Sequence, residues 1–109
     1  MLGNLIIVPI PRFSRKLLEL LPGWRETTVA PGRRIVRHSH DFLAFYFTFG
    51  IEAVETETGQ TAVPGAAVVI VPPNVMHGWI GPVRNGPGIV GHFHAGHRAH
   101  TVESLKIEA

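Results

Sequence analysis

The sequence predicts an all-β fold of short strands, and two features lead to this prediction. Twelve glycines and nine prolines interrupt the 109 residues, leaving segments too brief for long helices. Most of these segments are rich in β-branched and aromatic residues, which favour strands. With 45% hydrophobic and 17% charged residues, the chain can bury a core, and its length suits one domain. We therefore expect a single domain over residues 1–109, with its core at about residues 24–94.

The first part of the chain predicts one edge strand and at most one short helix. Leu5 to Ile10 is a short apolar run that ends at prolines, which is typical of an edge or lead-in strand. Phe13 to Leu21 places apolar residues near helical spacing, and Pro22 with Gly23 stops it. The helix is therefore expected near the N-terminus.

From Trp24 onward, the pattern predicts strands joined by turns. Thr58-Gly59-Gln60 is typical of a hairpin turn, and Pro72-Pro73-Asn74 breaks the chain again. Short strands at regular spacing indicate a sandwich or a closed barrel. The expected strands are Trp24 to Val29, Arg33 to Arg37, Phe42 to Phe49, Ile51 to Thr58, Thr61 to Val63, Ala66 to Val71, Trp79 to Ile80 and Ile89 to His94.

Composition narrows the classes of function. The chain has no cysteine, which excludes disulfides and thiolate metal sites. The longest apolar stretch, Ala66 to Val71, is far below the ~20 residues that cross a bilayer, and no basic leader is visible. We expect a cytoplasmic protein with no membrane contact. The net charge is only +2, and the arginine clusters lack interleaved aromatics, so we interpret them as solvated surface and expect no nucleic-acid partner.

The seven histidines carry the candidate chemistry. His38 and His40 are two residues apart in a β-type stretch, so both imidazoles are expected on one face. His77 follows the Pro72-Pro73-Asn74 turn, where a kinked backbone can direct its side chain towards the pair. Three neutral imidazoles would hold a transition metal and leave coordination positions open to water or a ligand. An isolated histidine is more often a surface or hydrogen-bonded core residue, so the prediction depends on convergence.

The surroundings of these histidines resemble the two motifs of the cupin superfamily. Gly32, five further residues and His38-Ser39-His40 are similar to the first motif, and Pro72 to His77 is similar to the second. Asn74 stands where glycine is common, and both residues tolerate positive φ. The resemblance covers about residues 24–94. It implies a double-stranded β-helix, or jelly-roll barrel, with a metal ion inside one mouth.

Within that superfamily, both motifs look like those of effector-binding domains of AraC-type transcription regulators, although the 109 residues include no helix-turn-helix segment. The family's first motif continues, after three or four residues, with a glutamate ligand, and Ala44 and Phe45 occupy those places here. Loss of the negative ligand favours zinc, nickel, iron or copper over manganese. The alternative is a decayed site that binds no ion.

Two further histidines bear on the coordination sphere. His92 and His94 share one face of the last expected strand, so either is a candidate fourth ligand. They are equally candidates for solvent-exposed positions, together with His97 and His100. A supporting hydrogen bond to a ligand is the third interpretation.

Four residues are candidates for lining a pocket near the histidines. Phe42, Ala44 and Tyr46 share the parity of His38 and His40, provided that no bulge intervenes. Trp79 is the fourth, and like Tyr46 it offers a polar group to a ligand. Core packing is the alternative for all four.

Three functions follow from these expectations. The first is a metal-binding module that binds or senses a small molecule; the second is a metal-dependent enzyme of dioxygenase or isomerase type. The third is a structural barrel whose histidines only form hydrogen bonds. The resemblance to AraC-type domains favours the binding or sensing function. The residues expected to face inward point the same way, because none is an obvious general base apart from His92 and His94. Open strand edges and the apolar Leu5 to Ile10 indicate a homodimer.

Overall fold

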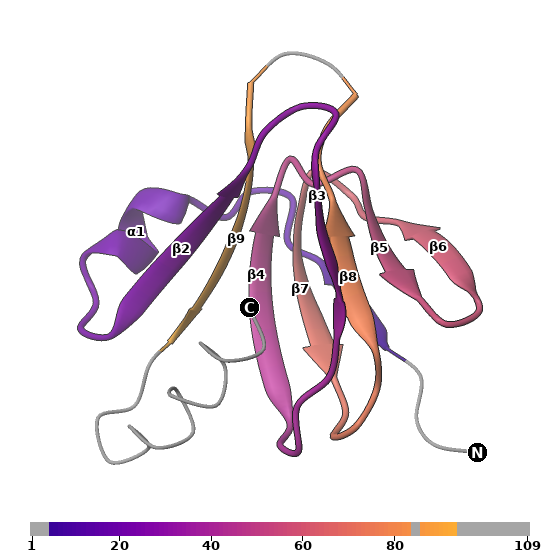
Figure 1. Ribbon diagram of the computed structural model, residues 1–109. Helices are drawn as coiled ribbons and strands as arrows, with labels where there is room; N and C mark the ends of the chain where they lie inside the picture. The colour runs from indigo at the N-terminus through magenta and orange to yellow at the C-terminus, as the bar shows by residue number, and fades with distance from the viewer. Residues whose placement is uncertain (1–4, 84–85, 94–109) are drawn as a thin grey trace.

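The computed structural model describes residues 5–83 and 86–93, which form nine strands and one short helix (Figure 1). The elements are β1 (Ile6–Pro9), α1 (Arg15–Glu19), β2 (Trp24–Val29), β3 (Arg34–His38), β4 (Ala44–Phe49), β5 (Ala53–Thr56), β6 (Gly59–Ala62), β7 (Ala66–Val71), β8 (His77–Ile80) and β9 (Gly88–Phe93). The all-β prediction is confirmed, together with the one short helix. In the described part of the chain, no helix has the length and apolar character needed to cross a membrane.

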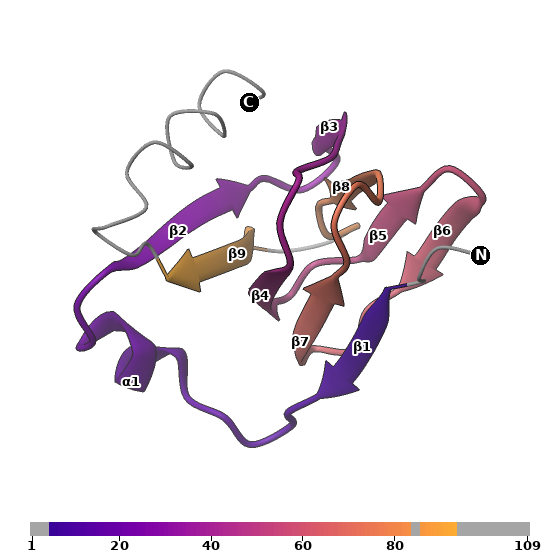
Figure 2. The ribbon, with the colours of Figure 1, turned by 90° about the horizontal axis from the view of Figure 1, so that it is seen from below.

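The strands form two antiparallel sheets. The five-stranded sheet has the order β1-β7-β4-β9-β2, and the four-stranded sheet has the order β3-β8-β5-β6. Figure 2 shows the two sheets as separate layers, with α1 beside the five-stranded one. Over the described residues each sheet keeps two open edges, so the strands make a two-layer sandwich and do not close into one hydrogen-bonded barrel.

The core lies between the two sheets because strand side chains alternate in direction. In β4 and β7 every second residue is buried, and the inward residues of the two strands stand opposite one another. Both sheets contribute to one buried cluster: Val29, Ala44, Tyr46, Ile51, Val54, Val63, Ala67, Val69, Val71, Trp79 and Val90. The four-stranded sheet, which carries His38 and His77, is thereby held against the five-stranded one.

The predicted strand bounds agree with the structure where the sequence pattern is strongest. β2 and β7 begin and end where the sequence indicated. β8 begins earlier than expected, at His77, because this residue pairs with His38 of β3. The hairpin turn lies at Glu57 and Thr58, one residue earlier than expected, since Gly59 already belongs to β6.

Candidate metal centre

The histidine triad, His38, His40 and His77, lies at one end of the sandwich where two connections cross between the sheets. His38 is the last residue of β3 and stands opposite His77, the first residue of β8. His40 was expected to share a strand with His38, but β3 ends at His38 and His40 lies in the connection to β4. That expectation was wrong, because the chain leaves the ladder one residue after His38.

A turn from the other sheet fixes His40 instead. The backbone N–H of Asn74, in the connection from β7 to β8, donates to the carbonyl oxygen of His40 at 2.6 Å. Asn74 has φ 63°, the left-handed conformation expected at this place of the motif. The ring of Phe42 stacks on the His40 ring, with centroids 5.0 Å apart and planes 11° apart. The two crossing connections therefore hold each other and the His40 side chain.

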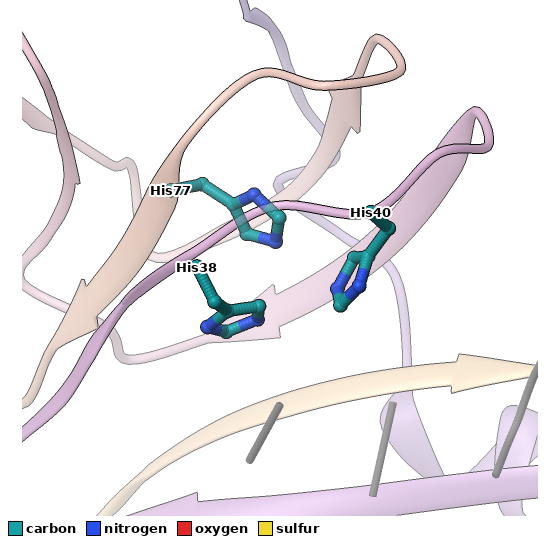
Figure 3. Close-up of side chains that lie close together, drawn as sticks. All are labelled: His38, His40 and His77. Carbon is teal, nitrogen blue, oxygen red and sulfur yellow. The ribbon is translucent and has the colours of Figure 1, made fainter. Parts of the chain in front are cut away.

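The three imidazoles converge (Figure 3). One ligand atom from each ring lies within 4.8 Å of the others, and the ring centroids are 4.5 to 5.2 Å apart. Nitrogen ligands at ~2.0–2.1 Å from a four-coordinate ion stand about 3.4 Å from each other. The ligand atoms of the triad therefore lie near one another and must approach further to share one ion.

Hydrogen bonds to the backbone select the ring nitrogen that two of these residues present. The Nδ1 atoms of His38 and His77 each lie 3.0 Å from a carbonyl oxygen, of Val36 and Val75 respectively. A carbonyl only accepts, so in both rings Nδ1 carries the proton and donates. In the neutral ring the lone pair therefore resides on Nε2, and this is the tautomer that binds a metal through Nε2.

His77 is the most confined member of the triad. Its side chain is fully buried, and its Nε2 atom has no hydrogen-bond partner. The pKa of His77 is lowered to about 4, chiefly because burial disfavours the charged ring; the hydrogen bond to the Val75 carbonyl opposes this shift, and the nearby His38 and His40 add to it. At neutral pH the ring is therefore uncharged, with a buried lone pair aimed at the other two imidazoles. A metal ion would satisfy that lone pair.

A bulge in β3 places His38 beside His77, and Gly78 makes room for it. The pairing of β3 with β8 shifts register between Ile35 and His38. A Cβ on Gly78 would lie 2.6 Å from the Ile35 carbonyl oxygen and 3.0 Å from the Arg37 nitrogen, so the bulge packs directly on this glycine. Sequence reasoning did not single out Gly78, since a glycine after a histidine has no distinct signature.

The remaining candidate residues occupy different places. His92 lies half-buried in β9, and its ring centroid is 6.2 Å from Tyr46, which contacts His77 at 5.5 Å. The structure does not group it with the triad in the described residues, so His92 lies near the site without joining the cluster. His94, with His97 and His100, falls outside the described residues. The cluster contains no carboxylate.

The residues predicted to line a pocket pack in or against the core. Ala44, Tyr46 and Trp79 are buried members of the core cluster, and Phe42 packs against it beside His40. The expected parity holds in β4, where Ala44 and Tyr46 face inward and Phe45 is half exposed on the other side. Nothing in this packing tests whether any of the four contacts a ligand.

Comparison with known proteins adds no identity. No protein-family model matches the chain, and no curated protein sequence matches it. The functional argument therefore stands on the triad and its surroundings.

Proposed function

We propose that this chain is a small metal-binding protein of the cupin type, in which His38, His40 and His77 hold one divalent transition metal ion and the open positions of that ion bind a small molecule. One observation carries the proposal. Within residues 5–83 and 86–93, the Nε2 lone pair of a buried, uncharged His77 has no hydrogen-bond partner, and it faces two further imidazoles. Histidines with only a structural role are normally hydrogen-bonded when buried, which this atom is not.

The ligand set supports a choice among metals. Three neutral imidazoles without a carboxylate suit zinc, nickel, iron or copper, whereas manganese prefers oxygen ligands. Three protein ligands also leave at least one position for an exogenous donor. Since His38 is only half-buried while His40 and His77 are buried, we place that open position on the His38 side.

The cupin assignment is supported by the two motifs and by the arrangement of the strands. Gly32 has φ 76° in the turn before β3, and Asn74 has φ 63° before His77, as the two motifs require of these positions. Two facing antiparallel sheets whose connections bring both motifs together are compatible with a jelly roll. Binding or sensing of a small molecule follows from this assignment as a proposal.

An enzyme is the second candidate, and the position of His92 favours it. This half-buried ring contacts Tyr46, which in turn contacts His77, so His92 is a candidate to exchange a proton with a group held near a bound ion. A metal-dependent dioxygenase or isomerase would use such a group. Oxygen uptake and isomerase activity of metal-loaded protein, compared with His92→Gln, test this candidate.

The decisive experiment is elemental analysis of protein purified without a histidine tag. We expect close to one ion per chain in the wild type, and loss of the ion in His77→Ala and in the double variant His38→Ala with His40→Ala. His92→Ala is the matched control and should retain the ion. Metal kept by the triad variants but lost from His92→Ala would place the site elsewhere, and no metal in any protein after loading would end the proposal.

A further inference from the structure

The outer face of the five-stranded sheet is apolar across four strands. Antiparallel pairing places Ile6 opposite Ile70 and Ile70 opposite Phe45 on this face. In the next row, Val8 stands opposite Val68, and the row continues through Phe47 and Gly91. Antiparallel sheets that face water on one side usually carry polar residues there, and these rows do not.

The outer face of the four-stranded sheet provides an internal comparison. It carries Arg34, Arg37 and Glu55, and Arg34 pairs with Glu55 at 3.2 Å. The four-stranded sheet also exposes Val36 of β3 (64%), so its surface mixes charged and apolar residues, whereas the two rows on the five-stranded sheet carry no charged residue. This difference identifies the five-stranded sheet as the unusual one.

Exposed apolar residues gather on this face and on the adjoining helix. Phe13, before α1, packs on Phe47 of the central strand β4, which brings the segment that leads into the helix onto the sheet face. The exposed members are Ile6 (54%), Val8 (43%), Phe45 (50%) and Phe93 (42%) on the strands, and Phe13 (39%), Leu17 (58%), Leu20 (79%) and Leu21 (49%) on or beside α1. We call this set the apolar side of the molecule.

The area of the apolar side exceeds what monomers usually expose. At roughly 150–200 Å² for each fully exposed large side chain, the eight residues offer on the order of 700 Å². The largest apolar patch of a typical monomer is about 300–600 Å², and a stable interface buries about 800 Å² per partner. Half-buried Val68 and Ile70, which lie between the exposed residues, bring the total into the range of an interface.

Part of the charge at the margin of the apolar side is paired within the chain, whereas the exposed Arg12 and Lys16, beside Phe13 and Leu17, are not among the paired groups that the structure describes. Arg15 contacts Glu19 at 3.0 Å and Glu26 at 3.3 Å, and Glu26 also accepts from the Trp24 indole at 2.8 Å. The carboxylates of Glu19 and Glu26 are therefore already engaged, and the choice of partner rests on the apolar area rather than on charge. The apolar side of a second copy of the chain is a matching surface, because a two-fold axis brings identical patches of two copies together.

Pairing through the face is favoured over pairing through the β1 edge. The backbone N–H of Ile10 donates to the carbonyl oxygen of Ala66 in β7, so by alternation the nitrogen of Pro9 lies on the open side of β1. Proline has no N–H, and this removes a donor from the open edge. We propose that two copies of this chain pack the outer faces of their five-stranded sheets together, a step independent of the metal centre.

Sedimentation velocity of the full chain, over a wide range of concentrations, tests the proposal. We expect the wild type at twice its 11.9 kDa mass. Phe45→Lys, and independently Ile6→Lys, should return the chain to the monomer mass, because each places a charge in the buried interface. Val83→Lys is the matched control: Val83 is 73% exposed in the loop after β8, away from this face, and the variant should stay dimeric.

Circular dichroism shows whether each lysine variant is folded, and its metal content shows whether the metal centre is intact, so loss of the interface can be told from loss of either. A monomeric lysine variant that is folded and keeps its ion supports the interface whether or not the metal proposal holds. A wild type at 11.9 kDa at every concentration overturns it. A monomeric wild type that sediments with phosphatidylserine-containing vesicles also overturns it and assigns the apolar side to lipid.

Discussion

Replacing Gly78 with alanine tests how the bulge in β3 controls the metal centre. The added Cβ would stand 2.6 Å from the Ile35 carbonyl oxygen, whereas ordinary contacts begin at 3.4 Å. The bulged segment of β3 must therefore move about 0.8 Å away from residue 78, the difference between these two distances. We expect His38, at the end of this segment, to move with it. The donor atoms of the triad must already move closer than 4.8 Å to bind an ion.

We expect this retreat to reduce zinc affinity by ~10- to 100-fold, the usual effect of disturbing a residue that positions a metal ligand. Overpacking should also lower the free energy of unfolding of the metal-free protein by ~1–3 kcal/mol. Affinity is measured by competition with a chromophoric chelator, and stability by urea denaturation. Gly65→Ala is the matched control, because a Cβ there meets nothing within 4 Å.

A second background shows whether Gly78 acts through His38. In His38→Ala protein, the further change Gly78→Ala should leave the residual zinc affinity unchanged, because the ligand that the glycine positions is gone. An equal loss in both backgrounds would mean that alanine only loosens the fold. Wild-type affinity in Gly78→Ala would refute the argument from the bulge.

Three further predictions concern stability. The pKa of His77 is lowered to about 4 in the folded chain, so below its ordinary value of 6.5 the unfolded chain binds the proton first. Metal-free protein should therefore lose about 3 kcal/mol of its free energy of unfolding as the pH falls from 6.5 to 4. His77→Gln should remove most of this pH dependence, as measured by urea denaturation. Asn74 has φ 63°, so Asn74→Gly should keep the stability of the wild type, whereas Asn74→Ala should lower the free energy of unfolding by ~1 kcal/mol in the same measurement. Equal stabilities of the glycine and alanine variants would contradict the role of the left-handed backbone. Gly91→Ala would drive a Cβ into the Trp24 ring on the outer face, and should lower the melting temperature by several degrees for a cost of ~1–3 kcal/mol without changing zinc affinity.

Periodicity and turn residues predicted the parts of the fold that depend on local signals. The bounds of β2 and β7 follow from β-rich segments that end at turns, and the inward parity of Ala44 and Tyr46 follows from alternation. The convergence of His38 with His77 was also expected, because the Pro72-Pro73-Asn74 turn precedes His77 and can direct its side chain towards the first histidine pair.

Features that depend on tertiary contacts could not be predicted from local sequence patterns. His40 reaches the site from a connection, where a hydrogen bond from Asn74 holds it, and no local pattern indicates that bond. The bulge next to Gly78 arises from a register shift between two strands, which alternation alone does not encode. Whether the sheets close into a barrel likewise depends on how their edges meet in space.

The hydrogen bond between Asn74 and His40 gives the triad a mechanical role. His38 and His77 belong to the four-stranded sheet. His40 lies in the connection from β3 to β4 and is hydrogen-bonded to the turn after β7, a strand of the five-stranded sheet. An ion shared by the three rings would cross-link both layers at this end of the sandwich. Metal removal should consequently accelerate hydrogen exchange first in these two connections, long before the opposite end of the molecule begins to exchange.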